Sequence, residues 1–346
     1  MRSCVLLLCT WSALAADMKQ WVEEHGGTAK TDQNSRITAL NLGFNWITDM
    51  ETEQIAAMRD LTTLDLSLSL ITDRGVERLQ SLPHVTDLNL YAVERITDTA
   101  LAYLRGWKQL QRLDLRGTDI TDTSLQYIGG LTNLRSLDVS YTQVTNNGMD
   151  SLSGLRNLEE LRLGGNKITG AGLHVLRLLP RLSSLSLSGD QKRNTEVWAI
   201  VLTDSDLEGI GQLGQLRSLD LGGIRIGDVA VAQLKHLAEL ESLDLGRTRV
   251  TNAGVEAIAA LPKLSRLSLW RVRTIDDGVA AALGSMRHLA TLDISETAVT
   301  DGVLEKLDAG NTLRLIYLTG SKVTAGGVDR FRRAHPDCRV DWIAVP

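Results

Sequence analysis

The chain has 346 residues, of which 43% are hydrophobic, 4% aromatic and 23% charged, with a formal net charge of −5. Nucleic acid and anionic membranes attract proteins through clustered lysine and arginine, so this mildly acidic chain is not expected to bind either. Two of the three cysteines, Cys4 and Cys9, lie in a segment that we expect to be removed. Cys338 then has no intramolecular disulfide partner, and no sulfur-rich metal site can form.

The first 15 residues read MRSCVLLLCTWSALA and resemble an export signal. Arg2 supplies a charged start, an apolar run follows, and Ala13-Leu14-Ala15 matches an A-x-A cleavage site. The run is shorter than the ~20 residues that span a bilayer. We therefore predict a signal peptide over residues 1–15 and a secreted or periplasmic protein without a membrane span. The alternative is a buried N-terminal helix.

Residues 16–36 are predicted to form an N-terminal cap. Met18, Trp21 and Val22 have helical spacing, and Gly26-Gly27 supplies a stop. A repeat array needs such a cap because its first repeat would otherwise expose its core to water.

The rest of the chain repeats one segment, LQRLDLRGTDITDTSLQYIGGLTN at residues 110–133. A period of this length with leucines in this spacing is typical of leucine-rich repeats. Most copies have 24 residues, whereas those that start at Val85 and Leu264 have 25 and the one that starts at Leu182 has 34. The twelve copies begin at Ile37, Leu61, Val85, Leu110, Leu134, Leu158, Leu182, Leu216, Leu240, Leu264, Leu289 and Leu313.

Each copy is predicted to hold one short strand and one short helix. The L-x-L core, such as Leu113-Asp114-Leu115, alternates inward and outward, and Leu125, Ile128 and Leu131 recur every three positions. The chain therefore divides into repeats over 37–337, with a C-terminal cap at 338–346. The residue after the strand is often Asn, Thr or Ser, which we expect to bond the turn backbone.

The third position of the Ile-Thr-Asp step is aspartate or asparagine in ten of the twelve repeats. Its oxygens are expected to accept the unpaired N–H groups at the start of the helix, where the helix dipole also favours negative charge. Because each has this structural role in its own repeat, we predict no metal site. These residues are Asp49, Asp73, Asp98, Asp122, Asn146, Asp204, Asp228, Asn252, Asp277 and Asp301.

The repeats at 71–76, Ile-Thr-Asp-Arg-Gly-Val, and at 250–255, Val-Thr-Asn-Ala-Gly-Val, resemble the I-T-D-x-G-L variety of the leucine-rich repeat family. Similar repeats occur in many bacterial envelope proteins and in F-box ubiquitin-ligase adaptors. The resemblance implies an α/β solenoid, a right-handed horseshoe with parallel strands on the concave face and short helices on the convex face. It also implies partner binding on the concave face, with no shared ligand and no catalytic residues.

The middle strand position faces the expected groove and is often acidic, at Asp65, Asp114, Asp138, Asp220, Asp244 and Asp293. Adjacent like charges on a sheet repel each other. This row is either an acidic groove for a basic partner or a common filler of the L-D-L pattern.

Two clusters of Tyr, Trp and Arg are candidate binding sites, because these residue types dominate binding hot spots. Chance and Arg–aromatic stacking are the alternative explanation. The first cluster is Tyr91, Arg116, Tyr141 and Arg162, and the second is Arg247, Arg266, Trp270, Arg271 and Tyr317.

The long repeat carries an insertion, SGDQKRNTEVWAI, at residues 188–200. Insertions in repeat proteins often lie on a binding face. We predict that it overhangs a groove floor of small residues and contacts a ligand through Trp198 and Lys192-Arg193; alternatively Val197, Trp198 and Ile200 return to the core. The small residues are Gly164, Gly165, Ser188, Gly189, Gly222 and Gly223.

The sequence has no phosphate-binding loop, nucleophile elbow, H-E-x-x-H or C-x-x-C motif. We therefore predict a monomeric, non-enzymatic, exported, bacterium-like protein that needs no cofactor and binds an unidentified protein. One alternative is a carbohydrate-binding or hydrolytic envelope protein that uses Trp270, Tyr91 and Tyr141 as sugar platforms. The other is a ubiquitin-ligase-type substrate adaptor, which would need an uncleaved N-terminus.

Overall fold

The computed structural model describes residues 18–193, 195–307 and 312–343. They belong to two compact units, unit 1 up to Arg162 and unit 2 from Leu163, and each is described by itself. The predicted signal peptide lies outside the described residues. In the described ranges, no helix is both long enough and apolar enough to cross a membrane.

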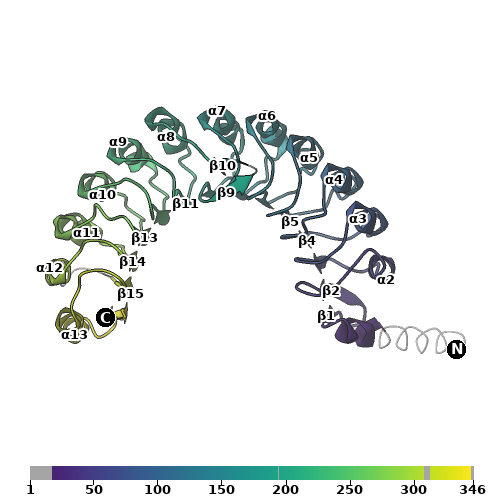
Figure 1. The fold of residues 1–346 in the computed structure, drawn as a ribbon, viewed down its shortest axis with the longest axis horizontal. Coiled ribbons are helices and arrows are strands. Elements are labelled where there is room, and N and C mark those ends of the chain that lie inside the picture. The colour runs from purple at the N-terminus through teal and green to yellow at the C-terminus, as the bar shows by residue number, and fades with distance from the viewer. Residues whose placement is uncertain (1–17, 194, 308–311, 344–346) are drawn as a thin grey trace, which may run out of the picture. The chain divides into compact units, whose positions relative to one another are not determined.

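Unit 1 alternates short strands with short helices (Figure 1), after a helical segment at residues 18–24. Strand β1 pairs antiparallel with β2, and β2 to β7 are parallel in chain order. The antiparallel β1 therefore covers the N-terminal edge of these strands. The elements are β1 Thr28–Thr31, β2 Ile37–Asn41, α2 Thr52–Ala57, β3 Thr63–Asp65, α3 Asp73–Leu79, β4 Asp87–Asn89, α4 Asp98–Leu104, β5 Arg112–Asp114, α5 Asp122–Ile128, β6 Ser136–Asp138, α6 Asn146–Met149, η1 Asp150–Gly154 and β7 Glu160–Arg162.

Unit 2 continues this alternation and contains one antiparallel hairpin, β9–β10, outside the parallel set. Strands β8 and β11 to β16 are parallel in chain order, and β16 extends the set into the predicted C-terminal cap. The elements are α7 Gly170–Leu173, η2 His174–Leu178, β8 Ser184–Ser186, β9 Asp190–Arg193, β10 Glu196–Ala199, α8 Asp204–Gly211, β11 Ser218–Asp220, α9 Asp228–Ala232, η3 Gln233–His236, β12 Ser242–Asp244, α10 Asn252–Ile258, β13 Arg266–Ser268, η4 Asp277–Val279, α11 Ala280–Ser285, β14 Thr291–Asp293, α12 Asp301–Lys306, β15 Leu315–Tyr317, α13 Ala325–Ala334 and β16 Arg339–Asp341.

The leucines of successive strands stand opposite one another. Leu64 pairs with Leu88, and Leu113 pairs with Leu137. These side chains are at most 3% exposed, so each repeat adds one layer to an apolar core between strands and helices. A slip of one residue would turn this row toward solvent, which fixes the register. In both units parallel strands lie on one side and short helices on the other (Figure 1), so the predicted fold class is confirmed.

The hydroxyl residues after the strands hold the turn, as predicted. The Thr118 hydroxyl donates to the Leu115 carbonyl at 2.7 Å, and the Thr142 hydroxyl donates to the Val139 carbonyl at 2.8 Å. Both threonines are fully buried, so each hydroxyl needs this partner. Thr248, Thr297 and Ser321 make the equivalent bond.

The aspartate of the Ile-Thr-Asp step joins its repeat to the next one. Asp73 accepts the Thr97 backbone N–H at 2.8 Å and the Thr97 hydroxyl at 2.6 Å. The Thr97 oxygen accepts the N–H of Thr99 and so caps its own helix, α4. This corrects the expectation that the aspartate caps the helix of its own repeat, a role that the threonine takes.

We call this pair the Asp–Thr latch. In every case the aspartate accepts the threonine N–H at 2.7–2.8 Å and also accepts its hydroxyl. The described residues contain seven latches, at Asp49–Thr72, Asp73–Thr97, Asp98–Thr121, Asp122–Thr145, Asp228–Thr251, Asp277–Thr300 and Asp301–Thr324.

The glycine of the repeat motif makes room for the latch. A Cβ on Gly75 would lie 2.6 Å from the Asp49 carboxylate, and one on Gly148 would lie 2.6 Å from that of Asp122. Ser124, at the same position in its repeat, instead donates its N–H and hydroxyl to Asp98. A residue larger than serine would displace the aspartate of the preceding repeat.

The repeat that starts at Leu182 lacks a latch on both sides. Gly170 stands where the preceding repeat would supply an aspartate, and Thr203 instead donates its N–H and hydroxyl to Asp206, three residues on. On the other side Asp204 faces a repeat whose threonine is replaced by Gly227. The first repeat shows the same substitute, because Thr48, with no repeat before it, donates to Glu51.

We predict that Asp98→Ala lowers the free energy of unfolding by about 2–3 kcal/mol, because it removes the acceptor of the Thr121 N–H, the Thr121 hydroxyl and the Ser124 hydroxyl, whereas the Ser124 N–H keeps its bond to the Thr121 carbonyl. The matched control is Asp204→Ala, which removes the same residue where no threonine receives it, and we expect a change below about 1 kcal/mol. Urea unfolding followed by circular dichroism measures both. Equal losses in the two variants would contradict the latch.

The pH dependence of the folding stability tests the same latch independently. Burial raises the pKa of Asp98, but the bonds from Ser124 and Thr121 outweigh burial and hold the pKa below its ordinary value. The latch therefore stabilises the protein fully above the pKa of the unfolded aspartate, and this stability is lost as the pH falls through the lower folded pKa. The difference between the two variants should shrink over that acidic range.

A second prediction restores a missing latch. Gly227 has φ −124° and ψ −164°, close to φ −112° and ψ −176° at Thr251, and a Cβ there meets only the Arg249 carbonyl at 3.9 Å. Gly227→Thr should therefore place a hydroxyl on Asp204 and stabilise the protein by about 1 kcal/mol more than Gly227→Val, which has the same shape without the hydroxyl. Equal midpoints for the two variants in urea would show that no latch forms.

Candidate functional site

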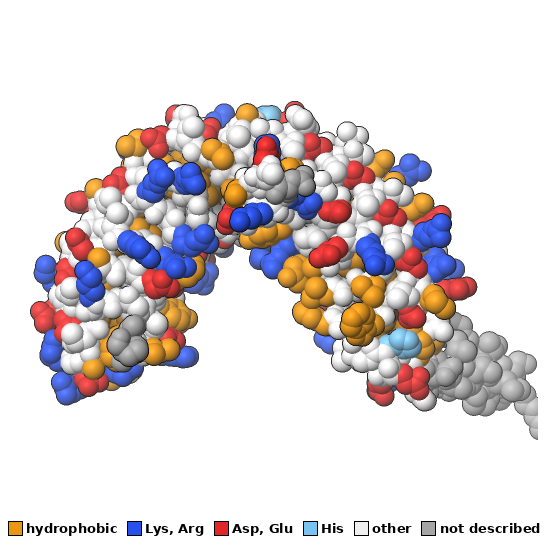
Figure 2. Space-filling model, viewed as in Figure 1, with side chains coloured by type: hydrophobic (Ala, Val, Ile, Leu, Met, Phe, Trp, Pro, Cys, Tyr) orange, Lys and Arg blue, Asp and Glu red, His pale blue; other side chains and the backbone are white. Residues whose placement is uncertain are grey.

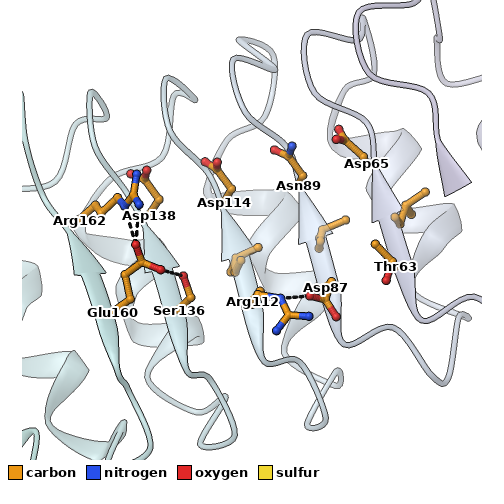
Figure 3. Close-up of a pocket in the computed structure, with 13 residues that line it drawn as sticks. Thr63, Asp65, Asp87, Asn89, Arg112, Asp114, Ser136, Asp138, Glu160 and Arg162 are labelled. Atoms are coloured by element: carbon orange, nitrogen blue, oxygen red, sulfur yellow. Dashed lines mark hydrogen bonds and ion pairs between the residues drawn. The ribbon is translucent and has the colours of Figure 1, made fainter. Parts of the chain in front are cut away.

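The strand face of unit 1 carries a shallow hollow of about 340 Å³. Figure 3 shows the polar side chains that line it, which come from strands β3, β4, β5, β6 and β7 and include two ion pairs. Arg112 pairs with Asp87, and Arg162 pairs with Glu160 at 2.6 Å. We call this the acidic hollow; its lining residues are Thr63, Leu64, Asp65, Asp87, Leu88, Asn89, Arg112, Leu113, Asp114, Ser136, Asp138, Glu160 and Arg162.

The acidic hollow holds five carboxylates and two guanidinium groups, a net charge of −3 when all are ionised. The first residue of each strand forms a row that we call the outer row. Two acids of this row, Asp87 and Glu160, form ion pairs with the two arginines. The third residue of each strand forms the inner row, in which Asp65, Asp114 and Asp138 make no ion pair among the described residues. Arg162 stands beside Asp138 at the end of this row and, with Arg116, offsets part of the charge around Asp114, so the least compensated carboxylate of the row is Asp65.

This inner row has a structural role that needs an oxygen but no charge. The Asp114 carboxylate accepts the backbone N–H of Arg116 at 2.9 Å, and Asp138 accepts that of Ser140 at 2.8 Å. Asn89, at the same position, accepts the Tyr91 N–H at 2.9 Å through its amide oxygen. The bond accounts for the L-D-L pattern, but an asparagine would serve equally well. The charge itself is left without a folding role.

The charge also has an energetic cost. Burial raises the pKa of Asp114 to about 6; the N–H of Arg116 opposes that increase, and the neighbouring Asp138 adds to it. In unit 2, burial likewise raises the pKa of Asp244, with Asp220 and Asp293 contributing. A carboxylate whose pKa is raised in this way destabilises the folded protein at neutral pH.

The first predicted cluster comes together only in part. The Arg116 guanidinium lies 4.5 Å from the centre of the Tyr91 ring and 5.9 Å from that of Tyr141, and it donates to the Tyr91 hydroxyl at 3.3 Å. These three half-buried residues form a stack at the end of the strands. Arg162, predicted to join them, is instead held by Glu160 in the acidic hollow.

The second cluster divides into four parts. Trp270 donates its indole N–H to Glu296 at 3.2 Å, and Arg271 pairs with the same carboxylate at 2.8 Å. Trp270 is 36% exposed, and the Arg271 guanidinium lies 5.2 Å from its ring centre. Arg266 stands on the outer row of β13, and Tyr317 on the inner row of β15. Arg247 lies 3.9 Å from Asp190.

Residues of both clusters occupy a strained backbone position. The second residue after each strand core has positive φ, and glycine fills it in several repeats, as at Gly117 and Gly223. Tyr141, Arg247 and Arg271 have φ 58° at this position. A residue other than glycine costs ~1–2 kcal/mol there, so these large side chains are kept at the expense of stability.

The described part of the insertion contains the β9–β10 hairpin, and β10 carries Trp198. Lys167 pairs with Glu196 at 2.6 Å and lies 5.8 Å from the Trp198 ring centre, with Arg193 at 6.0 Å. Ile200 is buried and Val197 is 59% exposed, so only one of the three apolar residues of the insertion returns fully to the core.

The glycines of the predicted bare floor differ in exposure. Gly164 and Gly165 are buried, and a Cβ on Gly164 would collide with the Ser188 carbonyl, so a side chain is excluded there by the backbone. Gly223 is exposed, and a Cβ on it would meet no atom within 4 Å apart from its own chain neighbours. The pair Arg247–Asp190 joins the repeats on either side of Gly222-Gly223. Of these four glycines, Gly223 is exposed, and the prediction that the insertion forms a pocket over them stays a prediction.

Comparison with known proteins agrees with this geometry. Two leucine-rich repeat family models match the chain, one at residues 132–191 and the other at residues 33–49, 57–79, 109–129 and 236–259. The chain therefore contains leucine-rich repeats, as the sequence predicts. Its narrower assignment to the I-T-D-x-G-L variety stays a prediction. No curated protein sequence matches the chain.

Solved leucine-rich repeat structures resemble the chain in fold. An internalin (inlF) from Listeria monocytogenes is 18% identical, with a TM-score of 0.63 over 96% of this chain and 95% of that one. A Leptospira interrogans leucine-rich repeat protein is 18% identical, with a TM-score of 0.46 over 92% and 94%. Internalin C2 from Listeria monocytogenes is 23% identical, with a TM-score of 0.44 over 73% and 90%. At 18% identity the likeness to internalin (inlF) supports the fold alone, and nothing is argued from the two structures with TM-scores below 0.5.

An apolar surface group in the first two repeats was not predicted from the sequence. Phe44, Trp46 and Met50 are 78%, 84% and 79% exposed, and Leu68 and Leu70 are also exposed. Figure 2 shows hydrophobic side chains gathered over the N-terminal repeats of unit 1. The signal was available: Phe44 and Leu68 stand where Gly117 stands in its repeat, a position that favours glycine.

We predict that Asp114→Asn stabilises the protein at pH 8. The folded state protonates Asp114 at higher pH than the unfolded chain does, so Asp114 costs little below its unfolded pKa and its full penalty above pH 6. A pKa raised this far corresponds to at most about 3 kcal/mol, and we expect a gain of about 1–2 kcal/mol at pH 8. Asparagine keeps the bond to Arg116, as Asn89 does for Tyr91.

Thermal unfolding at pH 4 and pH 8 measures this gain, which should vanish at pH 4. The matched opposite change is Asn89→Asp, which places another carboxylate between Asp65 and Asp114 in the same row. It should lower stability at pH 8, since like charges on adjacent strands repel. A gain from Asp114→Asn that is equal at both pH values would contradict the assignment of its cost to charge.

Proposed function

We propose that the chain is a non-enzymatic protein-interaction module that binds a partner protein on its strand face. The observation that carries the proposal is the Tyr91–Arg116–Tyr141 stack, held beside the acidic hollow by rigid strands. Tyrosine and arginine are enriched among residues that dominate binding energy. A surface already ordered before association loses little entropy when a partner binds.

Two features of this surface lower the folding stability of the protein, and binding of a partner would explain their presence. Tyr141 occupies a backbone conformation that favours glycine. The inner carboxylate row is charged where a neutral amide makes the same bond. Stability lost without a structural gain is typical of functional surfaces.

We propose further that the protein is exported, on the strength of the signal-like segment at residues 1–15. A sugar-binding role gains less support, because Arg116 covers one face of Tyr91 and Arg271 lies over Trp270. Sugar platforms need open ring faces. The favoured ligand is therefore a protein that contacts the edges and charges of these groups.

The test is capture of partners from an envelope extract by the chain from Ala16 onward. The strand-face variant combines Tyr91→Ser, Arg116→Ala and Tyr141→Gly, where glycine suits the positive φ. The control combines Tyr103→Ser, Arg105→Ala and Tyr127→Ser, which removes the same residue types from the helix side, at α4 and α5. Circular dichroism confirms that both are folded.

We expect one protein to be captured by the wild type and the helix-side control and lost, tenfold or more, by the strand-face variant. Capture that survives in the strand-face variant would place the binding surface elsewhere on the chain. Capture of no protein by any form, together with binding of an envelope oligosaccharide, would replace the proposal with the carbohydrate-binding alternative.

A further inference from the structure

Five large apolar side chains form a patch on the first two repeats of unit 1: Phe44, Trp46, Met50, Leu68 and Leu70. They come from equivalent places, since Phe44 corresponds to Leu68 and Trp46 to Leu70 in the repeat. Three of them are more than three-quarters exposed. Contiguous exposed apolar residues of this size mark interaction surfaces rather than ordinary protein surface. We call this group the apolar patch.

Folding gives no reason for the apolar patch. Phe44 has φ 64° and Leu68 has φ 55°, in the left-handed region where Gly117 and Gly165 stand in other repeats. Each therefore bears a backbone cost of ~1–2 kcal/mol relative to glycine and leaves its side chain in water. The hydrogen bonds of the turn do not need these side chains, because Phe44 and Leu68 contribute only their backbone N–H groups, to Ser67 and Tyr91.

The apolar patch is continuous with the acidic hollow. Asp65 lines the hollow, and its carboxylate accepts the N–H of Ser67, the residue before Leu68. A Cβ on Gly43, the residue before Phe44, would lie 3.0 Å from the same carboxylate. One partner segment lying along the strand ends would therefore meet apolar side chains and, within the same repeat, uncompensated negative charge.

Charge selects among the possible occupants. The hollow carries a net charge of −3 with both arginines engaged, so an anionic bilayer would be repelled from the adjoining patch. A symmetric contact between two copies would bring two acidic hollows together. A protein segment with apolar side chains beside lysine or arginine satisfies both parts of the surface.

We propose that the apolar patch and the adjoining acidic hollow bind one segment of a partner protein, which inserts apolar side chains at Phe44, Trp46 and Leu68 and directs lysine or arginine toward Asp65 and Asp114. The inference rests on the proposed function, in which a protein is bound on the strand face. It adds the chemistry of the partner and a set of residues outside the Tyr91–Arg116–Tyr141 stack.

The experiment selects peptides from a random displayed library on the full chain and measures the affinity of the recovered peptides by fluorescence anisotropy. The patch variant combines Phe44→Gly, Trp46→Ser, Leu68→Gly and Leu70→Ser. The charge variant combines Asp65→Asn, Asp114→Asn and Asp138→Asn, which keeps the turn bonds that Asn89 shows to be possible. The control, Leu178→Ser with Val201→Ser and Val229→Ser, removes other exposed apolar residues, all in unit 2.

We expect recovered peptides to combine apolar residues with lysine or arginine, to bind the patch variant at least tenfold more weakly, and to bind the control unchanged. The charge variant should weaken binding several-fold and flatten its salt dependence. Recovery of no such peptide, or equal affinity for the patch variant, overturns the proposal. So does a dimer, or binding to phosphatidylcholine vesicles, that the patch variant loses.

The two proposals fail separately. If the captured partner is lost by the strand-face variant and retained by the patch variant, the proposed function stands and this inference is wrong. If the strand-face variant and the patch variant both retain it, both are wrong. If both lose it and the charge variant weakens it, both are supported.

Discussion

The Asp–Thr latch is the constraint on which the regular repeats depend. The threonine hydroxyl donates to the aspartate of the preceding repeat and accepts the N–H that opens its own helix, as Thr97 does between Asp73 and Thr99. One side chain thus fixes both the start of a helix and its distance from the previous one. Gly75 must be small because the Asp49 carboxylate lies against it. The Ile-Thr-Asp-x-Gly motif is therefore one device shared by two repeats.

The exceptions to the latch show how the chain tolerates irregularity. At the repeat that starts at Leu264, Asp276 replaces the threonine, and the Asn252 amide of the preceding repeat donates to its carboxylate at 2.6 Å. The side-chain donor and acceptor thus exchange places, whereas the Asp276 N–H still donates to the Asn252 oxygen at 3.4 Å. At the long repeat, Thr203 turns to Asp206, as Thr48 turns to Glu51 at the start of the array. Its helix is thus tied to neither neighbour by a latch. A repeat without that constraint can accept extra residues, and the β9–β10 hairpin lies in this repeat.

Sequence periodicity predicted the fold because leucine burial needs only the spacing of apolar residues, as Leu64, Leu88 and Leu113 show. It could not predict the partner of Asp73, because the spacing leaves open which of two nearby helices the carboxylate meets. It joined Tyr91, Arg116 and Tyr141 correctly but could not show that Glu160 holds Arg162. It did not predict the exposed group of Phe44 and Trp46, because the repeat pattern is defined by buried leucines and says nothing about exposed positions.

The costs that the structure reveals all lie on the strand side and at the strand ends. Phe44, Leu68 and Tyr141 occupy backbone positions suited to glycine, and Asp114 is charged where Asn89 is neutral. None of these choices improves the latch or the leucine core. A single strained residue would be a minor exception, but strain, exposed apolar surface and unbalanced charge in adjacent repeats have a common explanation in binding. The Asp–Thr latches join one repeat to the next whatever residues stand at the strand ends. The protein can therefore tolerate the loss of stability that these residues cause.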